Sequence, residues 1–116
     1  MDCFKVEFFE KSDGSYPAEA FILSQDVKMR AKLFRILDLL SEKGYELREP
    51  YSKMLDDGIF EIRAKQGTDI TRILYFFVVG HKIILTNGFV KKTQKTPSGE
   101  IALAKKYRAE YKQRKE

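Results

Sequence analysis

Three segments of alternating side chains, separated by short turns, constrain the fold of this chain more than any other feature. Residues 59–65, 71–79 and 82–90 are rich in β-branched and aromatic side chains, and a period of two recurs along them. Their connections, Gln66-Gly67-Thr68-Asp69 and Gly80-His81, have lengths that suit hairpins. The sequence therefore predicts an antiparallel three-strand meander.

The flanking segments predict one more strand and three helices. Residues 3–10 have the aromatic and β-branched composition of a strand. Residues 17–24 begin with a proline that suits the first turn of a helix, and Asp26 can cap a longer helix that runs to residue 43. Pro97 is expected to open a final helix. On the longer helix, the apolar side chains recur at helical spacing as Val27, Ala31, Phe34, Leu37 and Leu40, and Leu33 and Ile36 widen this stripe.

This order of elements indicates an α+β fold. We expect a twisted antiparallel sheet, made of the N-terminal strand plus the three-strand meander, with two N-terminal helices and a C-terminal helix. The helices are expected to cover one face of the sheet and to leave the other face to a ligand. A chain of 116 residues has room for one such domain, so residues 1–116 are taken as a single unit.

Composition narrows the class of protein. The longest apolar stretch, residues 73–80, is far shorter than the roughly 18–20 residues of a membrane helix. The first residues have no signal-peptide pattern, so we expect a cytoplasmic protein without membrane contact. Because Cys3 is the single cysteine, neither an internal disulfide nor a thiolate zinc site is expected.

Positive charge is concentrated at the C-terminal end of the chain. Residues 91–116 contain nine Lys or Arg and three Glu, a net charge of +6, whereas residues 1–90 carry a net charge of −1. A basic segment at the exit of an apolar strand is the kind of electrostatic surface that attracts phosphates. The charge distribution therefore favours a nucleic-acid partner.

Candidate site residues project from one face of the meander. Alternation places Glu61, Arg63 and Lys65 together, opposite the apolar side chains of the same strand. Arg72 interrupts the next apolar strand and lies across the hairpin from Arg63 and Lys65. Three further lysines leave the last strand and are expected to join the cluster: Lys91, Lys92 and Lys95.

These residue types suit RNA cleavage by attack of the 2′-hydroxyl. That reaction needs a base for the 2′-hydroxyl proton, fixed cations for the phosphorane charge and an acid for the 5′ oxygen, and it needs no metal or cofactor. Glu61, or a lysine whose pKa is lowered by cationic neighbours, could be the base. Arg63 and Arg72 suit the phosphate because a planar guanidinium holds two oxygens. Direct RNA contacts are expected from Lys65, Phe89 and Lys95.

The same residues have structural interpretations. Glu61 and Arg63 could form solvated cross-strand pairs, and the lysines could be a solvated surface. Phe89 could stack on an RNA base or belong to the core. Arg72 is harder to explain in this way, because a cation within an apolar strand needs a partner or a ligand.

Several short motifs, taken in order and spacing, resemble a known family. They are Lys53-Met54-Leu55, Gly58-Ile59-Phe60-Glu61-Ile62-Arg63, Arg72-Ile73-Leu74-Tyr75-Phe76 and Gly88-Phe89-Val90-Lys91-Lys92-Thr93-Gln94-Lys95-Thr96-Pro97. The chain resembles the HigB-like, phage-derived branch of the RelE/ParE toxin superfamily, and residues 17–44 are similar to its paired N-terminal helices. The resemblance covers nearly the whole chain and implies a RelE-like fold.

The resemblance also implies a function. Members of this branch are toxins of type II toxin–antitoxin modules, and many are endoribonucleases (mRNA interferases) that cut mRNA in the ribosomal A site. The implied partners are the ribosome with its mRNA and a cognate, HigA-like antitoxin with a helix-turn-helix domain. The phosphate-stabilising positions of the family fall on Arg63 and Arg72, and its basic run falls on Lys91, Lys92 and Lys95.

Two other functions remain open at this point. ParE-like members of the superfamily inhibit DNA gyrase, and a basic module could bind RNA without cutting it. A nuclease needs its cations on one concave face, which a gyrase inhibitor does not. A small site without an evident proton-transfer histidine further predicts that the ribosome positions the substrate strand.

Overall fold

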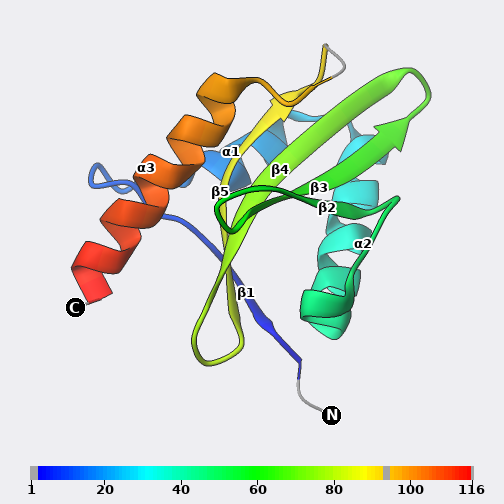
Figure 1. Ribbon diagram of the computed structural model, residues 1–116. Helices are drawn as coiled ribbons and strands as arrows, with labels where there is room; N and C mark the ends of the chain where they lie inside the picture. Colours follow the sequence, from blue (N-terminus) through cyan, green and yellow to red (C-terminus); the bar gives the residue numbers. More distant parts are fainter. Residues whose placement is uncertain (1–2, 93–94, 116) are drawn as a thin grey trace.

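Five strands form one mixed sheet in the described part of the chain, with helices on both of its faces (Figure 1). The computed structural model describes residues 3–92 and 95–115, so Thr93 and Gln94 of the basic run lie outside the described residues. The elements are β1 (Lys5–Phe8), α1 (Pro17–Ser24), α2 (Val27–Lys43), the 3-10 turn η1 (Gly44–Glu46), β2 (Ser52–Asp56), β3 (Ile59–Gln66), β4 (Asp69–Val78), β5 (Lys82–Val90) and α3 (Ser98–Lys115). The expected α+β class is confirmed, and the arrangement is compatible with a RelE-like fold.

The predicted meander is confirmed. Strands β3, β4 and β5 pair antiparallel in sequence order, and the strand order of the sheet is β1-β5-β4-β3-β2. The register places Arg63 opposite Arg72, and Arg72 opposite Phe89. Three residues that are far apart in the sequence therefore form one row across three strands.

Two strands differ from the sequence-based expectation. Strand β1 pairs with β5 in parallel, with Phe8 opposite Leu85, so the sheet is mixed rather than wholly antiparallel. Strand β2, for which we predicted no strand, pairs with β3 at the edge of the sheet. It is mostly exposed, and an edge strand of this kind lacks the half-buried alternation that identifies strands in a sequence.

Helices cover both faces of the sheet, which corrects the expectation of a bare face. Helices α1 and α2 pack on the face that carries Ile62, Ile73 and Tyr75, whereas α3 packs on the face that carries Leu74 and Phe76. Figure 1 shows α2 and α3 on opposite sides of the strands. The middle of β4 is apolar on both faces, as a strand covered on both sides must be.

The N-cap of α2 is confirmed, and its buried stripe is the predicted one rotated toward Leu33 and Ile36. The Asp26 side chain accepts a hydrogen bond of 2.8 Å from the backbone N–H of Met29. Val27 and Phe34, which we expected in the core, are 69% and 43% exposed. The helix has apolar residues on more than one side, so spacing alone did not select the face. The buried residues are Met29, Leu33, Ile36, Leu37 and Leu40.

None of the helices in the described residues is long and apolar enough to cross a membrane.

Gly44 allows the N-terminal segment to pack against the end of α2. Its φ of 53° is in the left-handed region, and a Cβ atom at this position would lie 2.0 Å from the Phe4 ring. Only glycine satisfies both conditions, so this residue ends α2 and lets the chain before β1 approach it closely.

We expect Gly44→Ala to lower the free energy of unfolding by about 2 kcal/mol or more, since it combines backbone strain with overpacking. Urea denaturation measures the loss. Gly67→Ala is the matched control, because Gly67 has a φ of 62° and no atom near its missing Cβ, so strain alone should cost about 1 kcal/mol. Gly99→Ala, in an open helical position, should be neutral or stabilising. Equal losses at positions 44 and 67 would contradict the contact with Phe4.

Candidate functional site

A buried carboxylate between two arginines lies at the centre of the candidate site. Strand β3 supplies Glu61 and Arg63, and β4 supplies Arg72. Glu61 Oε2 lies 3.1 Å from Arg63 Nε and 3.5 Å from Arg72 Nε. The Glu61 and Arg72 side chains are only 2% and 8% exposed. We refer to these three residues as the Glu61 cluster.

The Glu61 cluster compensates for an unfavourable cross-strand pair. Arg63 and Arg72 are directly opposite in the register, and like charges in that position repel each other. Glu61 lies two residues before Arg63 on the same face and supplies the counter-charge to both. Two arginines that lie side by side in a covered part of the sheet need a counter-charge, and the Glu61 carboxylate supplies it.

Glu61 also connects the sheet to the segment before α3. The hydroxyl of Thr96 donates a hydrogen bond of 2.5 Å to Glu61 Oε1. A second link joins the same regions, because the side-chain amide of Asn87 on β5 donates to Glu100 Oε1 at 3.0 Å. The start of α3 is thereby held beside the Glu61 cluster.

Burial makes the Arg72 guanidinium less basic without removing its charge. Its pKa lies below the ordinary value, first because of burial and also because of repulsion from Arg63, while attraction to Glu61 acts in the opposite direction. An arginine nevertheless stays protonated at neutral pH, because its ordinary pKa lies far above neutrality. Arg72 is therefore a fixed positive charge.

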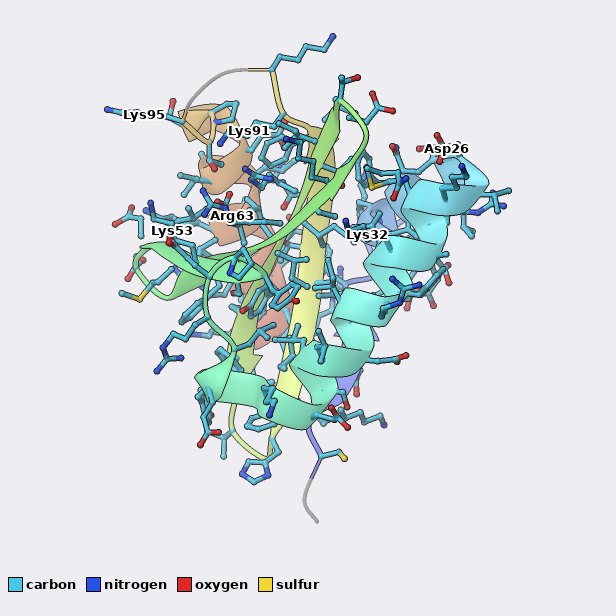
Figure 2. All side chains as sticks on the ribbon, turned by 90° about the vertical axis from the view of Figure 1, so that its right-hand side faces the viewer. Asp26, Lys32, Lys53, Arg63, Lys91 and Lys95 are labelled. Carbon is cyan, nitrogen blue, oxygen red and sulfur yellow. The ribbon has the colours of Figure 1, made fainter. Side chains whose placement is uncertain are left out.

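A cavity of about 250 Å³ opens beside the Glu61 cluster. We refer to it as the first cavity. Glu61 and Arg63 line it from β3, and Lys53 lines it from β2, directly opposite Glu61 in the register. Lys91 and Lys95 line it from the segment that follows β5. Figure 2 shows Lys53, Arg63, Lys91 and Lys95 gathered on one side of β3.

Lys91 differs electrostatically from an ordinary surface lysine. Burial lowers the pKa of its ammonium group below the usual value, and repulsion from Arg72 lowers it further. Repulsion from Arg63 and Lys53 acts in the same direction, whereas attraction to Glu61 raises the pKa. A larger share of Lys91 is therefore neutral near physiological pH than for a solvated lysine.

The outer end of Arg63 is weakly held. Its Nη1 lies 3.5 Å from Glu49 Oε2, and the Glu49 side chain is 59% exposed. The Nε atoms of Arg63 and Arg72 are buried and have no hydrogen-bond partner among the described residues, although both lie within ion-pair distance of Glu61. Glu61 thus holds the arginines by charge, and Arg63 lines the first cavity, where its guanidinium could hold two oxygens of a phosphate.

The structure brings together five of the eight residues singled out from the sequence and separates the other three. Glu61, Arg63, Lys91 and Lys95 line the first cavity, and Arg72 pairs with Glu61 from the neighbouring cavity, which it lines. In the described residues, Lys92 is exposed and does not line this cavity, and Lys65 is exposed and lines a different one.

Phe89 requires a correction. Its side chain is only 9% exposed and packs in the apolar cluster beneath α3. Phe89 is therefore a core residue, and its ring is not available to stack on a base. The reason is the position of α3, which covers the face of β5 that we expected to be bare.

Sequence reasoning missed Lys53 and Thr96. Lys53 was noticed only as part of a motif, because β2 was not recognised as a strand and alternation could not place its side chain. Thr96 precedes Pro97, and its bond to Glu61 joins residues that are 35 positions apart. Local patterns do not contain such a contact.

No group of three or more His, Cys, Asp or Glu side chains that could hold a metal ion occurs within residues 3–92 and 95–115.

Comparison with known proteins identifies one family. The family model described as "Phage derived protein Gp49-like (DUF891)" matches residues 20–109 of the 116-residue chain. The matched segment contains the Glu61 cluster and all of the lysines of the first cavity, but not β1. No curated protein matches the chain.

We expect Glu61→Gln to lower the free energy of unfolding by about 3 kcal/mol, because it leaves the buried Arg72 charge without its counter-ion. Chemical denaturation measures the change. Glu49→Gln is the matched control, since this exposed carboxylate also faces Arg63 and its loss should cost less than about 1 kcal/mol. The double variant Glu61→Gln/Arg72→Met should recover much of the loss. Similar small effects at positions 49 and 61 would contradict a buried cluster.

Proposed function

Since this chain belongs to the Gp49-like family of phage-derived proteins, a family associated with RelE/ParE-like toxins, we propose that it is a HigB-like toxin of a type II toxin–antitoxin module. In this proposal the toxin acts as an endoribonuclease that cuts mRNA on the ribosome, in the cytoplasm. The observation that carries the proposal is the Glu61 cluster beside a cavity lined by three lysines.

The cations of the first cavity match the charge that develops during RNA cleavage. Attack of the 2′ oxygen on phosphorus places extra negative charge on the non-bridging oxygens, and the bond to the 5′ oxygen then breaks to leave a 2′,3′-cyclic phosphate. Arg63, which lines the first cavity, and the buried Arg72 beside it are both held by Glu61 before the substrate arrives, so they stabilise that charge without reorganising. Pre-organised cations of this kind are the largest contribution that a site without an evident histidine can make.

Proton transfer in this proposal belongs to the lysines. Both oxygens of the Glu61 carboxylate are engaged, Oε1 by Thr96 and Oε2 by the two arginines, which makes Glu61 a positioning residue rather than the base. Neutral Lys91 accepts the 2′-hydroxyl proton. A protonated lysine of the same cavity, Lys53 or Lys95, donates a proton to the departing 5′ oxygen.

The proposed partners follow from the same surface. The positive charge of the first cavity attracts an RNA strand, and ribosomal RNA would align that strand for in-line attack. A cognate, HigA-like antitoxin with a helix-turn-helix domain would keep the toxin inactive by covering the cavity with acidic or apolar segments.

Arg63→Ala should lower the rate of ribosome-dependent mRNA cleavage by about 100-fold, as the loss of one charge-stabilising donor does in other enzymes. The fold should persist, because Arg72 remains to pair with Glu61. Cleavage is measured by mapping new 5′ ends on ribosome-bound and free mRNA after brief induction in bacteria. Lys112→Ala, which removes an exposed charge near the end of α3, is the control and should cut normally.

The result of this mapping also separates the alternative functions. Growth arrest with no new mRNA ends, together with trapped gyrase–DNA complexes, would replace this proposal with gyrase inhibition. RNA binding that depends on Arg63 without any cleavage would indicate a non-catalytic RNA-binding module.

Lys91→Arg tests proton transfer separately from charge. Arginine keeps the positive charge but does not release its proton at working pH, so we expect cleavage to fall by at least about 100-fold while RNA affinity stays close to wild type. Below the pKa of Lys91, each pH unit raises the neutral fraction tenfold. The wild-type rate on programmed ribosomes should therefore rise with pH between about 6.5 and 8.5, and the variant should lose this rise. An active Lys91→Arg variant with the wild-type pH profile would exclude Lys91 as the base.

A further inference from the structure

A second cavity, of about 290 Å³, lies on the other side of Arg63. Its apolar walls are Ile36 of α2, Ala64 and Ile70 of the β3–β4 hairpin, and Pro50 and Tyr51 of the segment before β2. We refer to it as the second cavity. Its volume is near the lower end of the roughly 300–1,000 Å³ that is typical of small-ligand pockets.

The second cavity exists because β2 ends its pairing early. Strand β2 pairs with β3 as far as Ser52 opposite Ile62, and the Arg63 N–H then donates to the Tyr51 carbonyl at 2.8 Å. Further along β3, a side chain replaces the missing strand, because Lys32 Nζ donates to the Lys65 carbonyl at 2.5 Å. These two hydrogen bonds pair backbone groups at the edge of β3. A hollow is left between α2 and the segment before β2.

The charged residues that line the second cavity have one sign. Lys32, Arg63, Lys65 and Arg72 line it, and no carboxylate is among the described residues that do so. Figure 2 shows Lys32 reaching from α2 toward β3, on the side away from Lys53 and Lys91. Arg63 lines both cavities, so the two are neighbours that share one guanidinium.

An apolar hollow with an aromatic rim and a cationic border suits a single nucleotide. Tyr51 is 41% exposed and lines the cavity, so its ring is available to a ligand. Proteins bind the bases of single-stranded RNA by stacking on aromatic side chains and hold the adjoining phosphates with Lys and Arg. The second cavity offers both kinds of contact beside the proposed site of cleavage.

We propose that the second cavity is a nucleotide subsite, which holds the base adjacent to the phosphate bound in the first cavity. The base stacks on Tyr51 against the apolar walls, Arg63 contacts the phosphate between the two subsites, and Lys32 contacts the next phosphate along the strand. This inference rests on the proposed function, because it assigns to the same RNA strand a second point of contact.

The test measures how tightly the full-length protein binds short RNA in which single bases are missing. The probes are a fluorescent, fully 2′-O-methylated hexanucleotide, which cannot be cleaved by 2′-hydroxyl attack, and six versions with one abasic position each. Affinities are measured by fluorescence anisotropy at one low salt concentration. For the wild-type protein, we expect one abasic position to weaken binding by about tenfold, the loss of one stacked base.

Variants at Tyr51 show whether that base occupies the second cavity. The Tyr51→Ala variant should bind the intact probe more weakly by a similar factor. Its affinity should then no longer depend on whether the base at that same position is present. The Tyr51→Phe variant keeps the ring and should bind as the wild-type protein does. The Tyr51→Leu variant keeps apolar volume but has no ring, so it should bind as weakly as Tyr51→Ala and serves as the test if the Ala variant is unstable. Lys32→Ala should weaken binding uniformly across the probes, whereas Lys28→Ala, an exposed lysine one turn earlier on α2, should not.

The outcomes separate this inference from the proposed function. If Arg63→Ala weakens binding but Tyr51→Ala and every abasic probe do not, the nucleotide subsite is wrong and the cleavage site is unaffected. If the wild-type protein binds no probe, the subsite is also wrong, and the proposed function is then decided by the ribosome cleavage assay alone. Tyr51-dependent binding of an acidic peptide without Tyr51-dependent binding of RNA would overturn the subsite in favour of a protein partner.

Discussion

The buried Glu61 carboxylate is the interaction on which the rest of the site depends. Two arginines lie opposite each other on β3 and β4, and without a counter-charge their repulsion would oppose the strand register that the apolar residues of the meander favour. Glu61 pairs with both, and its second oxygen accepts the hydrogen bond of Thr96. One carboxylate therefore stabilises the pairing of two strands, the arginine side chains and the attachment of the segment before α3.

The position of α3 determines where a ligand can reach the sheet. Both faces of β4 are covered, and the first cavity lies where the covering layer ends, near the start of α3. There the cations come from β2, β3, β4 and the segment after β5. Because these elements are far apart in the sequence, only the folded sheet brings their cations into one cluster. Because Arg63 and Arg72 are fixed on strands rather than on a loop, they stay in place before an anion arrives.

Charge and burial act on the residues of the site in opposite ways. Arg72 remains protonated despite its burial, whereas burial and the neighbouring cations lower the pKa of Lys91 and raise its neutral fraction. A group of basic residues can in this way provide both fixed positive charge and a proton acceptor. Membership of the Gp49-like family and this division of roles support the same proposal, that RNA is the substrate.

The sequence by itself determined the elements whose signals are local. Alternation and turn residues predicted the three strands of the meander, Asp26 marked the start of α2, and the same alternation placed Glu61 and Arg63 on one face. Only the tertiary structure decided the parallel pairing of β1, the edge strand β2 with Lys53, the buried face of α2, the burial of Phe89 beneath α3 and the bond from Thr96 to Glu61. The physical reason is range: periodicity and capping act over a few residues, whereas these contacts depend on which distant segments compete to cover the same apolar surface.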